Sequence, residues 1–123
     1  KLQSLMTSNV GILRTNELLN KALSELSIIK TQLLSNNSDN PNNFEYSIFS
    51  YFELLNMLDV AETIVSSSLL REESRGSHFR LDFPLRNDKD WLSHVLVQLF
   101  NSNLKTSLEP VIINDIFPDS RTY

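Results

Sequence analysis

The chain has 123 residues, a formal net charge of −4 and no cysteine. This length corresponds to one domain, and the acidic balance argues against a nucleic-acid-binding protein, which would carry a basic patch. The absence of cysteine excludes disulfides, iron–sulfur ligation and thiol catalysis within these residues. No apolar run approaches the ~20 residues that cross a bilayer, so we expect no direct membrane span.

The first third of the chain predicts two helices. A short helix is expected over residues 2–7, and Gly11 interrupts it because glycine disfavours helix interiors. Thr15 is a suitable N-cap, and apolar residues then recur every three or four positions, which predicts a helix over residues 16–34. The polar, asparagine-rich residues 35–43 predict an exposed loop.

Another long helix is expected over residues 44–73, where the apolar stripe is unusually broad. A helix that is apolar over so much of its circumference is covered on more than one side. The helix over 16–34 would cover one side, and the tail of the chain or a partner would cover the other. Gly76 follows this helix, and a C-terminal glycine cap is the natural interpretation.

The last third of the chain predicts β structure. Asp88 is a candidate cap for a short turn, and apolar, β-branched residues over 95–99 and 111–113 predict two short strands. These strands would form a hairpin through the turn-forming residues 101–103. An irregular tail is expected over residues 117–123.

Together these patterns predict a mainly α fold, namely a small antiparallel helical bundle with a C-terminal β-hairpin or extended tail. Residues 1–92 would form the helical bundle, which includes an arginine-rich loop over residues 71–90. Residues 93–123 would form the hairpin and tail within the same single domain.

The loop over residues 71–90 is dense in charge, with four arginines and one lysine balanced by five carboxylates. This balance favours ion-pair networks, because the planar guanidinium of arginine can bind several carboxylate or carbonyl oxygens at once. The network would tie the loop to the helices or to a neighbouring domain. A solvated charged face and a substrate-anion site are the alternatives.

The sequence contains no recognisable catalytic or cofactor-binding motif. His78 could serve as a general base, but no serine or cysteine nucleophile with a known motif accompanies it. His78 and His94 are too few for a metal site, and only two glycines are present, so no glycine-rich phosphate loop can form. We therefore predict no catalytic, cofactor-binding or metal-binding residues. The candidates for structural or interface roles are Arg71, Arg75, His78, Arg80, Asp82, Arg86 and Trp91.

Residues 71–84 read REESRGSHFRLDFP, which resembles a long signature, R-x-E-S-R-G-x-H-x-R-x-D-F-P. This signature belongs to the carboxy-terminal domain of the flavoprotein subunit of succinate dehydrogenase and fumarate reductase. The R-x-D-x-x-W-x-x-H pattern that follows it is similar to residues 86–94. The opening at residues 10–15 and the ending at 118–123 are also similar to the family, and the opening suits L-aspartate oxidase, a close relative, as well.

The resemblance implies a non-catalytic helical domain that packs on the flavin-binding domain of the same chain and supports dicarboxylate oxidoreduction. It implies that the parent protein is an FAD-dependent oxidoreductase, while this chain alone binds no cofactor and is not an enzyme. It also implies proximity to an iron–sulfur subunit, a hinge role for residues 71–91 and a buried-anchor role for Trp91.

Three further expectations concern location and identity. The implied location is cytoplasmic and peripheral on the inner face of the membrane, through partner subunits. The first alternative is the C-terminal domain of L-aspartate oxidase, an enzyme of NAD biosynthesis. The second alternative is an independent helical interaction module that binds another partner.

Overall fold

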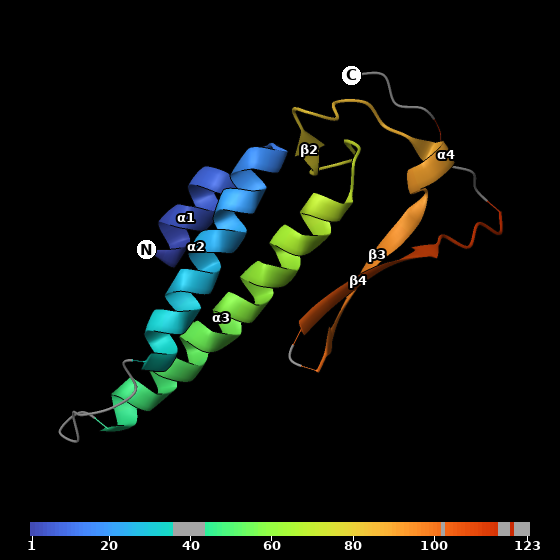
Figure 1. Cartoon of the computed structure of the whole chain (residues 1–123). Helices are drawn as coiled ribbons and strands as arrows, with labels where there is room; N and C mark the ends of the chain where they lie inside the picture. Colours follow the sequence, from blue (N-terminus) through green and yellow to red (C-terminus); the bar gives the residue numbers. More distant parts are fainter. Residues whose placement is uncertain (36–43, 102, 116–118, 120–123) are drawn as a thin grey trace.

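The computed structural model describes residues 1–35, 44–101, 103–115 and 119. Within these residues the fold is mainly helical and carries one antiparallel β-hairpin near the C-terminus, as the sequence predicts (Figure 1). The predicted loop over 35–43 and tail over 117–123 lie, apart from Ser35 and Asp119, outside the described residues. The division into residues 1–92 and 93–123 within one domain stays a prediction.

The first two helices begin and end close to where the sequence places them. Helix α1 spans Leu2–Asn9, and helix α2 spans Asn16–Ser35. Thr15 caps α2 as predicted, because its Oγ1 accepts a hydrogen bond from the Leu18 amide at 3.2 Å. Between the two helices, a Cβ placed on Gly11 would lie 2.8 Å from the Thr7 carbonyl oxygen, so a glycine is required at this turn.

The longest helix, α3, spans Phe44–Leu70 and ends three residues before the predicted end at residue 73. The early end is explained by Arg80, whose guanidinium donates to the carbonyl oxygens of Ser68 and Leu69, at 2.8 and 3.3 Å. A cation that satisfies the last carbonyls of a helix stabilises its terminus. The predicted glycine cap was therefore wrong, since Gly76 lies beyond the helix in a separate turn.

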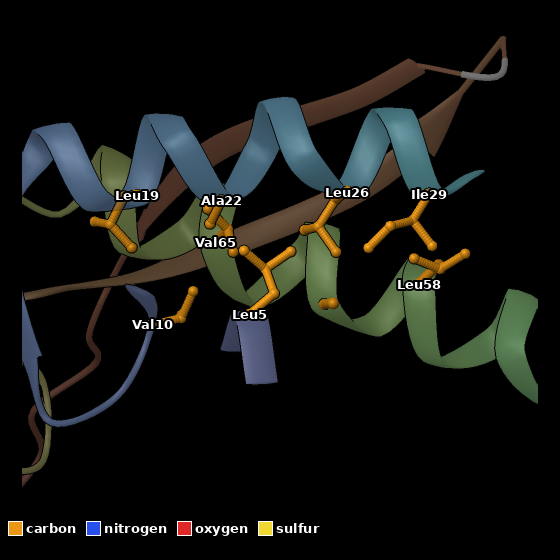
Figure 2. Packing of buried hydrophobic residues seen from close by; sticks show 9 residues of the cluster. Leu5, Val10, Leu19, Ala22, Leu26, Ile29, Leu58 and Val65 are labelled. Atoms are coloured by element: carbon orange, nitrogen blue, oxygen red, sulfur yellow. The ribbon is translucent and has the colours of Figure 1, made fainter. Parts of the chain in front are cut away.

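The hydrophobic core lies where α1, α2 and α3 meet (Figure 2). Leu19, Leu26 and Leu58 have no exposed surface, and each lies on the apolar stripe that predicted its helix. Burying a leucine side chain contributes about 1.5–3 kcal/mol to stability, so this seam holds the helices together. The buried apolar residues are Leu5, Val10, Leu19, Ala22, Leu26, Ile29, Leu58, Ala61 and Val65.

Strands β3 and β4 span Ser93–Phe100 and Asn103–Pro110 and form the antiparallel hairpin. The placement of the second strand at residues 111–113 was wrong, because β4 begins directly after the turn and ends before them. Asn101 has a φ of 48°, which allows the tight turn that pairs Phe100 with Asn103. Turn geometry has set the register here, rather than the β-branched residues that follow.

The hairpin packs along α3 on the side opposite α2 (Figure 1). We expected α3 to be covered on two sides. Helix α2 covers one side, and the hairpin covers the other over part of the length of α3. The cover is incomplete, since Phe49, Phe52, Met57 and Val60 stay exposed. None of the helices in the described residues is both long enough and apolar enough to cross a membrane.

Two short features close the fold at the end of the molecule where α2 begins. Strands β1, Leu13–Arg14, and β2, Phe79–Arg80, pair in parallel, and the sequence does not predict them. Helix α4 spans Asp88–Trp91, and its cap is Asn87, whose side chain accepts from the Asp90 amide at 3.2 Å. The prediction of Asp88 as the cap was wrong by one residue.

Candidate functional site

The candidate site is the signature loop, residues 71–91, which runs from the end of α3 through β2 to α4. The pairing of β2 with β1 brings the middle of this loop to the beginning of α2, far away in the sequence. The Leu81 amide extends the pairing by donating to the Arg14 carbonyl oxygen at 2.8 Å. One loop therefore contacts α2, α3 and the hairpin together.

Arg80 is the most buried basic residue of the loop, with 1% of its surface exposed. Its Nε and Nη2 donate to both carboxylate oxygens of Asp82, each at 2.7 Å, and Nη1 reaches the end of α3. Asp82 in turn accepts from the Asn16 amide, in the first turn of α2, at 2.8 Å. Arg80 thus lies at the negative end of one helix and Asp82 at the positive end of another, where each helix dipole stabilises that charge.

The hydrogen bonds from Arg80 lower the pKa of Asp82 to about 2, against the opposing effect of burial. Burying the Arg80 guanidinium is costly, and it is tolerable only when the remaining donors and acceptors of the ion pair are satisfied. Here the carbonyls of α3 and the amide of α2 supply those partners. The pair therefore fixes the relative position of two helices.

Glu73 forms a second buried centre and has no exposed surface. Arg75 binds it with two hydrogen bonds, from Nε at 2.8 Å and Nη2 at 3.0 Å, and Arg71 also donates to Oε1. The Asn87 amide donates to Oε2 at 2.8 Å. Burial alone would raise the pKa of Glu73, but these hydrogen bonds outweigh it, so the pKa lies below its ordinary value.

The network continues to the surface through Asp88. This carboxylate accepts from Arg75 Nη2 at 2.6 Å and from Arg86 Nε at 2.7 Å, and the two arginines lower its pKa to about 2. Arg86 also donates from Nη1 to the Asp119 carbonyl oxygen at 2.9 Å. The loop is therefore joined to a residue close to the C-terminus.

Arg71 joins the helices to the hairpin. Its Nη1 donates to the Trp91 carbonyl oxygen at 2.9 Å and its Nη2 to the Ser93 carbonyl oxygen, while its guanidinium carbon lies 5.6 Å from the centre of the Trp91 ring. Trp91 is half-buried by the described residues. Its role as a buried anchor stays a prediction.

His78 is held in one tautomer by its two neighbours. Arg14 Nη1 can only donate, so His78 Nδ1 at 2.9 Å must accept, and Nε2 then carries the proton that points to the Arg71 carbonyl oxygen at 3.3 Å. Burial lowers the pKa of His78, and the charges of Arg14, Arg80 and Arg71 lower it further, although the bond to the Arg71 carbonyl opposes them. The imidazole is therefore neutral near pH 7, with no acceptor left for general-base work.

This geometry predicts a pH dependence of stability. The unfolded chain binds a proton at His78 near its ordinary pKa of 6.5, whereas the folded chain binds it only at lower pH. Between these pKa values the unfolded state holds more protons, so the free energy of unfolding falls as the pH drops from about 7.5 to about 5.5. Urea unfolding at the two pH values measures the fall, and His78→Gln, which can accept and donate at similar positions, should reduce it. His94→Gln, on the exposed face of the hairpin, is the control, and an equal reduction there would contradict the assignment.

Arg75 and His78 form a tight turn, each donating its amide to the other's carbonyl oxygen, at 2.8 and 3.0 Å. The first central residue, Gly76, has a φ of 59°, in the left-handed region that favours glycine. No atom lies within 4 Å of an added Cβ, so Gly76→Ala should cost only backbone strain, about 1–2 kcal/mol. Thermal unfolding checks this value. Gly76→Asn should cost less, because asparagine tolerates this conformation, and equal losses for both variants would contradict the explanation.

A hollow of about 600 Å³ opens beside this loop, between the end of α3 and the start of β3. Three arginines and two histidines line it, namely Arg14, Arg71, Arg75, His78 and His94, and no carboxylate does. The remaining lining residues are Ile64, Ser67, Ser68, Trp91, Leu92, Ser93, Val95 and Val111. No group of three or more histidine, aspartate or glutamate side chains in the described residues could hold a metal ion.

The structure brings the seven predicted residues into one connected loop, and their role as an interface stays a prediction. The ion pairs predicted from the balanced charges do form. The residue list predicted from the sequence omitted Glu73, which is the centre of one cluster, and Arg14, which fixes the His78 tautomer. Glu73 lies within the charge-dense stretch, so the same signal could have found it, whereas nothing local marks Arg14.

Comparison with known proteins gives consistent matches over the whole chain. The family described as "Fumarate reductase flavoprotein C-term" matches residues 1–123. The fumarate reductase flavoprotein subunit of Mycobacterium tuberculosis is 37% identical, over 99% of this chain and 21% of its own length. The succinate dehydrogenase flavoprotein subunit of Rickettsia bellii is 36% identical, over 78% of this chain and 16% of its own length.

A solved structure agrees with these relatives. FrdA of E. coli quinol fumarate reductase superposes with a TM-score of 0.87 at 29% identity, and the match covers 95% of this chain and 21% of that one. The chain thus spans about a fifth of the length of the relatives it matches. These matches do not favour the L-aspartate oxidase and independent-module alternatives. The chain belongs to the family of C-terminal domains of fumarate reductase and succinate dehydrogenase flavoprotein subunits.

Proposed function

We propose that this chain serves as a non-catalytic docking domain, which packs on the flavin-binding domain of a dicarboxylate oxidoreductase subunit. In this role α1, α2 and α3 act as a small antiparallel helical bundle that holds the signature loop in one conformation. The parent protein would be an FAD-dependent fumarate reductase or succinate dehydrogenase. An iron–sulfur subunit would be a further partner, and any membrane association would be peripheral, through such subunits.

The exposed outer side of α3 carries this proposal. Val60 and Met57 expose 57% and 48% of their surface on the helix that leads into a loop whose charges are largely paired within the chain. Exposed apolar surface beside a rigid polar rim is typical of protein–protein interfaces. The ion pairs would then act as the rigid support of the interface rather than as reacting groups.

The residues present do not fit a flavin. A dinucleotide site of this kind needs a glycine-rich turn that brings backbone amides to the pyrophosphate of FAD. The chain has two glycines, and each lies in a different turn. Gly11 lies against the Thr7 carbonyl oxygen, with no room for a side chain, and Gly76 lies in the two-residue turn between Arg75 and His78. FAD would therefore be held by the rest of the subunit, and we assign no step of its chemistry to this chain.

Cleavage of the full-length subunit at a protease site inserted before Lys1 tests the proposal. We expect the cut chain to stay bound to the flavin-binding part through gel filtration, with the flavin absorbance near 450 nm retained. Arg75→Ala should weaken this association, because it releases Glu73 and Asp88 together. Immediate separation of the two parts, with full flavin occupancy of the larger one, would reject the proposal.

A further inference from the structure

The hollow beside the signature loop is lined by both cationic and apolar side chains. Arg14, Arg71 and Arg75 supply the positive charge of the lining, and its apolar members include Ile64 of α3, Val95 of β3 and Val111. The chain as a whole is acidic, with a net charge of −4, whereas this lining holds three arginines and no carboxylate, and Arg14 forms no ion pair within the described residues. The hollow therefore complements a ligand that is both anionic and apolar.

Two of the guanidinium groups that line the hollow have nitrogens that make no hydrogen bond within the described residues. Arg14 uses Nε and Nη1 for bonds to its own chain, and Arg75 uses Nε and Nη2 for Glu73 and Asp88. Within the described ranges, Arg14 Nη2 and Arg75 Nη1 make no hydrogen bond. Neither nitrogen is among the buried polar atoms that lack a partner, so both reach solvent. Both nitrogens can therefore donate to a further carboxylate.

The apolar wall extends beyond the hollow along α3. Ile64, Val60 and Met57 follow one another at spacings of four and three residues, so they lie on one side of the helix, which also carries Ser67 and Arg71. Their exposed fractions are 41%, 57% and 48%. A small dicarboxylate would leave this surface in water, whereas an extended segment would cover it.

We propose that this groove binds a segment of the flavin-binding domain in which apolar side chains adjoin an aspartate or glutamate. The apolar side chains lie along Met57, Val60 and Ile64, and the carboxylate reaches the guanidinium groups at the end of α3. This inference rests on the proposed function and names the surface and the chemistry of the partner. The positive end of the groove then sets the register of docking.

Photocrosslinking in the full-length subunit tests the assignment. With p-benzoylphenylalanine at position 64, we expect crosslinks to one segment of the flavin-binding domain that contains an aspartate or glutamate, identified by mass spectrometry. The same group at Ile28, which is exposed on α2, should give no crosslink to that segment. A segment without a carboxylate, or crosslinks to other molecules only, would overturn the proposal.

Charge variants at Ser67 make the test specific. Ser67 lines the hollow one turn before Arg71, so Ser67→Glu places a competing carboxylate among the arginines. We expect the crosslinking yield to fall by about tenfold or more, because the new carboxylate at position 67 would repel the carboxylate of the bound segment. Ser67→Gln has the same shape as Ser67→Glu without the charge, and Thr63→Glu places a carboxylate one turn before Ser67, at a residue that does not line the hollow. Both should change the yield by less than about twofold.

Three outcomes separate this inference from the proposed function. If the cleaved chain stays bound but position 64 gives no crosslink, the groove assignment fails and docking stands. If Ser67→Glu and Ser67→Gln have equal effects, the carboxylate part of the assignment fails. If free succinate suppresses the crosslink, the groove binds a small dicarboxylate and the docking assignment is wrong.

Discussion

Replacing Arg80 with methionine is expected to lower the free energy of unfolding by about 3–5 kcal/mol, because a buried guanidinium loses its hydrogen bonds to a carboxylate and to main-chain carbonyls. The variant removes both bonds to Asp82 and leaves the Ser68 and Leu69 carbonyls at the end of α3 without their donor. Domains of this size are stable by about 5–15 kcal/mol, so much of the stability would be lost. Urea unfolding followed by circular dichroism measures the effect.

A surface pair provides the matched control for this prediction. Lys30 binds Asp59 and Glu62, both at 2.9 Å, and it is partly exposed. Exposed ion pairs contribute about 0–1 kcal/mol, so Lys30→Met should lower stability only slightly. If the Arg80 and Lys30 variants lost equal stability, burial would not be what makes the Arg80 pair important.

Glu73→Gln is expected to have the second largest effect, again about 3–5 kcal/mol, because it leaves Arg71 and Arg75 without their shared carboxylate. The glutamine has nearly the same shape, so a loss of this size would report charge and not volume. Glu72→Gln changes the exposed neighbour and should be nearly neutral. Equal midpoints in urea for the two variants would contradict the prediction.

A double-mutant cycle gives a sharper version of the same test. Arg75→Met alone should also destabilise, but combining it with Glu73→Gln should cost less than the sum of the two, because neither charge then remains without its partner. Additive losses would mean that the two side chains stabilise the loop independently. The coupling free energy is obtained from the four unfolding curves.

The helices were largely predictable from the sequence because their signals are local. Apolar residues at helical spacing located α2 and α3, and the Thr15 cap marked the beginning of α2. The end of α3 was not predictable in this way, since it depends on Arg80, which returns from ten residues beyond Leu70. A long-range donor competed with local helix propensity and determined where the helix stops.

The candidate site was predictable only as a set of residues. The charge-dense stretch and the family signature identified the loop, but not which arginine binds which carboxylate. Glu73 and Asp82 lie between arginines in the sequence, and their partners depend on how the chain turns at Gly76. The contact between Arg14 and His78 arises from a parallel pairing of two residues on each side, which no periodicity indicates.

The attachment of the hairpin to the helices has a consequence for natural sequence variation. Arg71 contacts the main-chain carbonyl oxygens of Trp91 and Ser93, and these oxygens are present whatever side chain those positions carry. Position 93 can therefore carry different side chains in relatives without releasing the hairpin. Position 71 has no such freedom. The planar guanidinium of arginine binds two carbonyl oxygens and a carboxylate at once, and the single ammonium group of a lysine could not reach all three.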